Sequence, residues 1–256
     1  MNRLFDYLPL IFYRGVADIR AEASRSYLGI LWWVIEPSLY LAAFYLIFAL
    51  GFRGGGGVDY VAFLLSGLIL WKWFHSSVSG GCYSISSNQG LVNQVYIPKF
   101  VLPLTVVVSG FFKFLFILTL FFTLMLLLGF EPSIVWAAVP VLMVAQILIA
   151  TGIGMLGAVV VSFVSDFRLV IDNGLMMLFF MSGIFFDISE RSEEAQRILY
   201  LNPVAVLIRE FRRIVLDAEW PNWSDLALVG LEGVAFILVG SMLLRKFDRI
   251  IPKVVV

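Results

Sequence analysis

Residues able to carry catalytic or metal chemistry are scarce in this 256-residue sequence. There is one histidine, His75, and one cysteine, Cys82, too few for a His/Cys metal site. The glycine run 54–57 lacks the Lys-Ser/Thr pair of a phosphate-binding loop, so we interpret it as a flexible turn. We predict that the chain is not an enzyme and holds no metal or cofactor. Work that needs ATP and Mg²⁺ would then require another chain to bind them.

Two ionisable residues, Glu36 and Lys72, interrupt long apolar runs. At about 1.5 Å per helical residue, Glu36 lies roughly 9 Å from the start of its run, and Lys72 lies about 18 Å from the opposite end of the next run. These depths are comparable within a hydrocarbon core of roughly 30 Å. Charges at such depth mark functional sites. The two residues either pair with each other or line the path of an anionic lipid headgroup.

Aromatic side chains accompany these charges. Trp33, Pro37, Tyr40, Phe44 and Phe48 recur at three- or four-residue steps and so share one helix face, while Trp71 and Trp73 flank Lys72. Aromatic faces let sugar C–H surfaces slide past without fixing any one hydroxyl, which favours a sugar path. Tryptophan and tyrosine are also common as packing residues and as anchors at membrane interfaces, and this alternative stays open.

The stretch "QVYIPKFVLP", 94–103, and the polar run before it form a different kind of element. Two prolines stiffen it and exclude a regular helix or strand. Its amides provide hydrogen bonds without the cost of burying charge. Lys99 is expected at the tip of the hairpin. We predict a docking element for a partner protein, the alternative being an ordinary connecting loop. The residues concerned are Asn88, Gln89, Asn93, Gln94, Tyr96, Pro98 and Lys99.

The elements that must position these residues are membrane-spanning helices. Mean hydropathy is +0.96 and only 14% of residues are charged, against about a quarter in soluble domains. The net charge of zero gives no attraction to nucleic acid. We predict an all-α integral membrane protein with a single domain, 1–256, and six transmembrane helices. The predicted spans are 31–51, 60–83, 102–129, 134–163, 168–186 and 226–244.

Basic residues indicate the orientation of the spans. They gather in the N-terminal segment, the 84–101 hairpin, the 164–168 turn and the C-terminal tail. On the other face the 52–59 loop has only Arg53 and the 130–133 loop has no basic residue. Because cytoplasmic loops are enriched in Lys and Arg, both termini and the hairpin are expected in the cytoplasm.

Three amphipathic segments lie outside the spans. Residues 1–29 have the pattern of a helix in the membrane interface. The 187–225 region predicts two short external helices, the second with Asn202 as N-cap and Pro203 as first residue. Leu207 and Phe211 lie on its apolar face, which should dip back against the spans, and Arg212 is expected on its polar face. The alternative is a solvated surface lid.

Three motifs match one family. The stretches "SYLGILWWVIEPSL" (26–39), "NQGLVNQVYIPKFVLP" (88–103) and "LNPVAVLIREFRRIVL" (201–216) resemble the first helix, the cytoplasmic segment between helices two and three, and the second external gate helix of ABC-2-type polysaccharide export permeases. The resemblance runs nearly end to end. One departure is that Ser26 separates Arg25 from Tyr27, where the family commonly has an adjacent basic-aromatic pair before Leu-Gly.

The resemblance implies an ATP-driven exporter. Segment 88–103 would be the coupling helix seated in a cleft of the partner ATPase, and 187–225 would be an external gate region. The family implies a homodimer with two ATPase copies in the bacterial inner membrane, and an undecaprenyl-linked polysaccharide as substrate. O-antigen is favoured over capsule or teichoic acid. Export of a small drug or lipid is the nearest alternative, and a membrane-embedded glycan-modifying enzyme is a more distant one.

Overall fold

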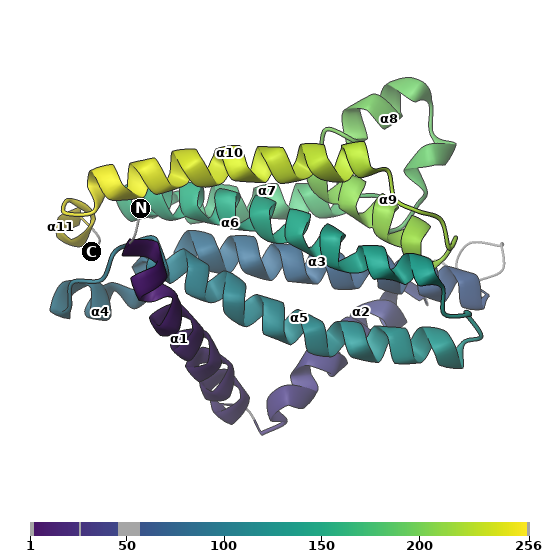
Figure 1. Ribbon diagram of the computed structural model, residues 1–256, viewed down its shortest axis with the longest axis horizontal. Coiled ribbons are helices and arrows are strands. Elements are labelled where there is room, and N and C mark those ends of the chain that lie inside the picture. Colours follow the sequence, from purple (N-terminus) through teal and green to yellow (C-terminus); the bar gives the residue numbers. More distant parts are fainter. Residues whose placement is uncertain (1–2, 26, 46–56, 255–256) are drawn as a thin grey trace.

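The computed structural model describes residues 3–25, 27–45 and 57–254, and in these ranges the chain is helical with no strand (Figure 1). Short 3-10 turns join several of the helices. The helices are α1 (Arg3–Arg25), α2 (Trp32–Tyr45), α3 (Val58–Tyr83), α4 (Gln89–Gln94), α5 (Val101–Leu127), α6 (Val139–Phe163), α7 (Phe167–Met181), α8 (Glu193–Leu199), α9 (Pro203–Val215), α10 (Trp223–Phe247) and α11 (Ile251–Val254).

Four helical segments in the described part of the chain are long and apolar enough to cross a membrane. They are α3, α5, α6 with its preceding 3-10 turn, and α10, and they match four of the predicted spans within a few residues. The predicted first span, 31–51, is described only as far as Tyr45, where α2 ends. The predicted fifth span, 168–186, corresponds to the 15 residues of α7, because the chain leaves the helix after Met181.

Helix α6 lies between α3 and α10, and small residues let the three backbones approach closely. A Cβ placed on Gly154 of α6 would lie 3.3 Å from the Cα of Gly81 on α3. Three residues further along α6, the buried side chain of Cys82 fills the space beside Gly157. Helices in a membrane associate through this kind of van der Waals packing, because burying apolar groups away from lipid gains little.

The contact between α6 and α10 is closer still. A Cβ on Gly233 of α10 would lie 2.5 Å from the backbone nitrogen of Ile149, and one on Gly152 of α6 would lie 2.9 Å from the carbonyl oxygen of Gly233. Both obstacles are backbone atoms, which cannot move aside as a side chain can. These glycines therefore fix the distance between the two helices.

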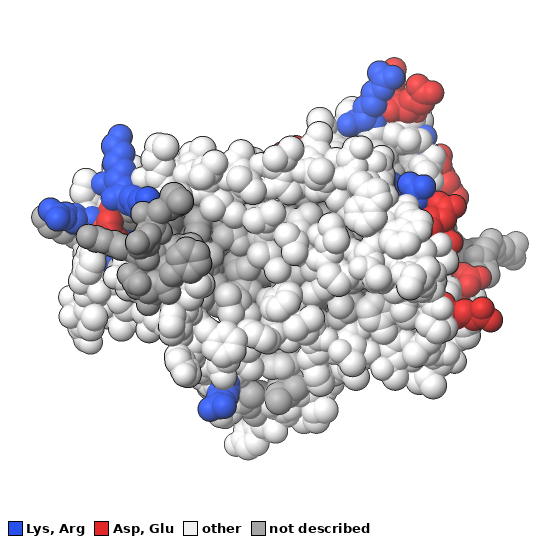
Figure 2. Space-filling view, in the orientation of Figure 1, with Lys and Arg blue, Asp and Glu red and all other residues white. Residues whose placement is uncertain are grey.

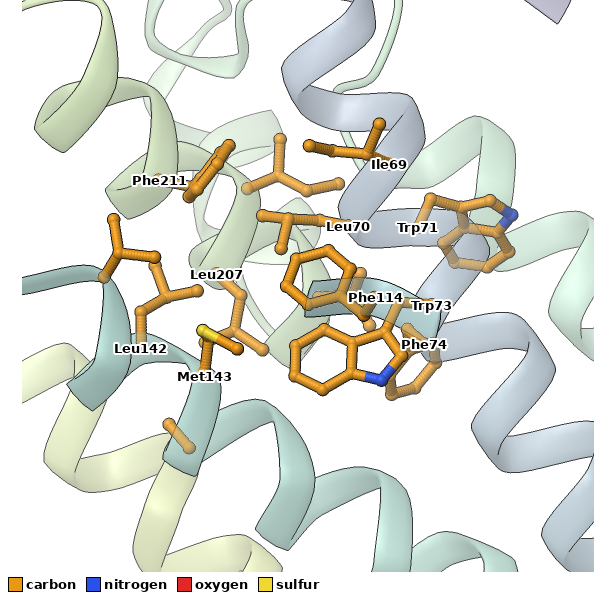
Figure 3. Close-up of a cluster of buried hydrophobic side chains, with 14 of the residues drawn as sticks. Ile69, Leu70, Trp71, Trp73, Phe74, Phe114, Leu142, Met143, Leu207 and Phe211 are labelled. Atoms are coloured by element: carbon orange, nitrogen blue, oxygen red, sulfur yellow. The ribbon is translucent and has the colours of Figure 1, made fainter. Parts of the chain in front are cut away.

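The main hydrophobic core joins α3, α5, α6 and α9 (Figure 3). Trp73 of α3 stacks on Phe114 of α5, with ring centroids 4.0 Å apart and planes 9° apart. Leu207 and Phe211 of α9 are fully buried in the same cluster. The apolar face of α9 therefore packs into the bundle, and α9 is not a solvated lid.

The two ends of the bundle differ in the elements and charges that they carry. Helices α4 and α11 and the start of α1 lie at one end, and α8 and α9 lie toward the other (Figure 1). On the face shown in Figure 2, one group of Lys and Arg side chains lies at the first end, and nearly all the Asp and Glu side chains, with further Lys and Arg beside them, lie at the second. Uncharged residues make up most of the broad band between the two ends. This is the charge distribution of a membrane-spanning bundle.

We expect Gly233→Ala to destabilise the protein by about 1–3 kcal/mol, because its Cβ would force α10 away from α6. Gly230→Ala is the matched control, since its Cβ would meet only the Cδ1 of Leu148, at 3.9 Å. Thermal unfolding in detergent measures both. Equal unfolding midpoints for the two variants would show that the close approach of the backbones does not matter.

Candidate functional site

A cavity of about 570 Å³ lies between α1, α2, α3 and α5. Four of the seven residues predicted for the substrate path line it: Trp33, Glu36, Lys72 and Trp73. Serines and a tyrosine of α3 and the following turn, and the side chain of Asn88, add polar surface. A cavity with aromatic, hydroxyl and charged walls can accept a polar molecule among helices that are otherwise apolar.

Lys72 and Glu36 form an ion pair across the cavity, joining α3 to α2. Their side chains are 26% and 53% exposed, respectively, so the pair is accessible from the cavity. The comparable depths counted along the sequence agree with this contact. Because both residues also line the cavity, pairing and lining a path are compatible.

A second ion pair was not foreseen from the sequence. Lys113 of α5 pairs with Glu22 of α1 on the wall of the same cavity. Glu22 also accepts a hydrogen bond of 3.1 Å from the indole Nε1 of Trp33, and the Lys113 ammonium lies 5.7 Å from the centre of the Trp33 ring. A lysine inside an apolar run is a visible signal, but nothing in the sequence indicates that its partner lies on α1.

The two tryptophans that flank Lys72 point to different sides of α3. Trp73 faces α5, and its buried Nε1 has no hydrogen-bond partner among the described residues. Trp71 packs against Phe179 of α7 and lines a separate cavity of about 200 Å³. Lys72 lines both cavities. The side chains of Tyr40 and Phe44, also predicted for the path, lie outside the described residues.

The predicted docking element forms a short helix, α4, followed by an extended turn. Asn93, Gln94 and Tyr96 are exposed, whereas Asn88, Gln89 and Pro98 are half-buried. The Asn88 side chain accepts a hydrogen bond from Arg14 of α1 and donates one to the backbone of α3's C-terminal turn, at Ser84. The exposed side chains of Asn93, Gln94 and Tyr96 form a strip of amide and aromatic groups, and the segment that carries them is fixed to α1 and to the end of α3 through Asn88.

Lys99 is not at the tip of a hairpin, contrary to the expectation from the sequence. It is only 1% exposed, and its ammonium donates a hydrogen bond of 3.0 Å to the carbonyl oxygen of Ile97. Burial lowers the pKa of Lys99, and the nearby carboxylate of Asp248 opposes that shift. The burial of Lys99 results from a tertiary contact, because the chain folds back after Tyr96 and places Lys99 beside Asp248 at the end of α10.

In the predicted gate region, Asn202 accepts a hydrogen bond from the N–H of Val204, and Pro203 is the first residue of α9. The placement of Arg212 on a solvated polar face is wrong. Its guanidinium is buried and donates to the carbonyl oxygens of Gly183, Ile184 and Phe63 at 2.7–3.0 Å.

The burial of Arg212 has a physical reason. The chain leaves α7 through Gly183, with φ of 67°, so the carbonyls at 183 and 184 have no helical N–H to bind them. Buried carbonyls need donors, and a guanidinium provides five in a fixed fork. Arg212 thus fastens α9 to the end of α7 and to the N-terminal part of α3.

The sequence is similar to those of known transport proteins over most of its length. Residues 17–216 match the family described as ABC-2 type transporter. The chain is 26% identical over 247 residues to an O-antigen export system permease protein RfbA from Klebsiella pneumoniae, covering 96% of this chain and 93% of that protein. It is 27% identical over 251 residues to an RfbA of Myxococcus xanthus, covering 96% and 95%. The polysialic acid transport protein KpsM of Escherichia coli is 26% identical over 245 residues, covering 91% of each chain. This chain belongs to the ABC-2 type transporter family.

Proposed function

We propose that this chain is the permease subunit of an ATP-driven exporter that moves a lipid-linked polysaccharide, with O-antigen favoured, across the bacterial inner membrane. The observation that carries the proposal is the collinear similarity, over more than nine-tenths of the chain, to proteins named as O-antigen export permeases. The cavity lined by Trp33, Glu36, Lys72 and Trp73 supports it, since aromatic and polar walls suit sugars and charged headgroups.

The proposed assembly is a homodimer with one channel and two copies of a separate ATPase that binds ATP and Mg²⁺. Helices α2 and α7 complete six spans per subunit. The end of the bundle that carries α4, α11 and a group of Lys and Arg with few acidic side chains faces the cytoplasm, in keeping with the enrichment of basic residues on that side of membranes. The strip at Asn93, Gln94 and Tyr96 contacts the ATPase, and α8 and α9 form the external gate.

A capsule-type polymer is the second candidate substrate, supported by the match to KpsM at 26% identity, which is no lower than that to one of the O-antigen permeases. Teichoic acid and small drugs or lipids have no such support among these relatives.

Deletion of the gene for this chain in its own host tests the function. Loss of surface polysaccharide together with intracellular accumulation of a lipid-linked polymer is expected, and the tagged chain should bring down an ATPase of different sequence. The released polymer identifies the substrate as O-antigen or capsule. Normal surface polysaccharide in the deletion strain would refute the proposal.

Lys72→Met should reduce export, because it strands Glu36 in the cavity. Removing one partner of a fully buried pair costs roughly 3–5 kcal/mol, and the partial exposure of this pair places the cost below that range. Surface polysaccharide in the complemented deletion strain is the measurement. If the pair itself matters, adding Glu36→Gln restores part of the activity.

A role of Lys72 in binding an anionic headgroup predicts no such rescue, since the positive charge is then required, and predicts that Lys72→Arg keeps more activity than Lys72→Met. Full activity of Lys72→Met would exclude both roles and leave Lys72 as a simple anchor.

Asn93→Ala should weaken association with the ATPase or lower ATP hydrolysis by the complex, because it removes an exposed hydrogen-bonding group from the docking strip. Glu193→Ala, at the exposed start of α8, is the control at the opposite end of the bundle. Co-purification and ATP turnover are measured for both. Identical behaviour of the two variants would make 88–103 an ordinary connecting loop.

A further inference from the structure

The carboxylate of Asp248, directly after α10, holds the turn that follows α4. Its Oδ2 accepts a hydrogen bond of 2.6 Å from the hydroxyl of Tyr96, and its Oδ1 accepts one of 3.2 Å from the backbone N–H of Lys99. Asp248 is thus the common acceptor for two donors that lie about 150 residues earlier in the chain. Hydrogen bonds to a charged acceptor are stronger than those between neutral groups.

An apolar cluster lies beside this polar contact. Val92 of α4 and Ile251 of α11 are buried in one group with Leu244 of α10, Leu102 of α5 and Met155 of α6. Together with the burial of Lys99, this cluster means that the 88–103 segment rests on the end of the bundle and does not project freely from it.

The location of Asp248 decides which helices the segment is attached to. By sequence the segment connects only α3 and α5. Through Asp248 it is also attached to α10, whose backbone is in close contact with α6 at Gly152 and Gly233. A displacement of the segment is therefore passed to α10 and α6 as a packed pair, as well as to the two helices that it joins.

We propose that Asp248 is a positioning residue that fastens the docking turn to α10, so that a push or pull from the ATPase moves α10 and α6 instead of bending the turn. The proposal rests on the proposed function. Two features of Tyr96 agree with it. Its hydroxyl is bound to Asp248, which raises its pKa, while its side chain is 71% exposed and remains available to a partner. One residue can therefore contact the ATPase and relay force to α10.

Hydrogen–deuterium exchange of the purified full-length chain tests the attachment. Asp248→Asn removes the charge at nearly constant size, and Tyr96→Phe removes the hydroxyl donor and keeps the ring. Because Asp248→Asn replaces charge-assisted hydrogen bonds with weaker neutral ones, exchange of the backbone amides in 94–100 should become roughly tenfold faster, which corresponds to about 1.4 kcal/mol. The double variant should exchange no faster than Asp248→Asn alone. Asp166→Asn, an exposed carboxylate before α7, is the matched control.

The complex with the co-purifying ATPase tests the relay. Two quantities are compared: the surface polysaccharide of the complemented deletion strain, and the ATP turnover of the complex purified from it. The ratio of polysaccharide to ATP turnover should fall severalfold in Asp248→Asn and stay unchanged in Asp166→Asn. A merely structural role would lower the amount of complex and leave this ratio unaltered. Unchanged exchange in 94–100, or faster exchange with an unaltered ratio, would overturn the role of Asp248. Failure of the wild-type chain to bring down any ATPase would instead refute the proposed function, and the relay with it.

Discussion

The close contact of α6 with α3 and α10 is the constraint on which the rest of the bundle depends. Within a membrane, apolar side chains gain little by leaving lipid, so helices are held by packing at short range. Gly154 against Gly81, and Gly152 against Gly233, allow this packing on opposite neighbours of one helix. The resulting rigid core supports α9 on one side and leaves α1 and α2 to enclose the charged cavity on another.

The second requirement of such a bundle is that irregular backbone inside it finds hydrogen-bond partners. Arg212 meets this need where the chain leaves α7, and Asp248 meets a related need where the chain turns after α4. In both places a charged side chain binds backbone groups from a distant part of the sequence. The charged side chains therefore connect elements at the ends of the bundle, while the glycines determine how closely the helices approach in its middle.

The sequence was sufficient for features that depend on neighbours along the chain. Long apolar runs predicted α3, α5, α6 and α10, the Asn202-Pro203 pair predicted the start of α9, and counting residues gave matching depths to Glu36 and Lys72. It was insufficient where the partner is distant. From the sequence, Lys99 between two prolines is expected to be exposed, and Arg212 among other charges is expected to be solvated. The groups that surround them in the fold, the carboxylate of Asp248 and the backbone carbonyls bound by Arg212, belong to distant parts of the chain. The features missed in this way are the burial of Lys99 and Arg212 and the pairing of Glu22 with Lys113.

The packing of Cys82 between α3 and α6 has a practical consequence for studying motion in this protein. It is the single cysteine of the chain, and it is 1% exposed beside Gly157, where there is no room for a reagent. A thiol introduced on the surface would therefore be the one that a maleimide probe reaches in the folded protein. Spectroscopic labels can be attached at chosen positions in the otherwise natural sequence, and the helix contact that Cys82 completes need not be disturbed to prepare them.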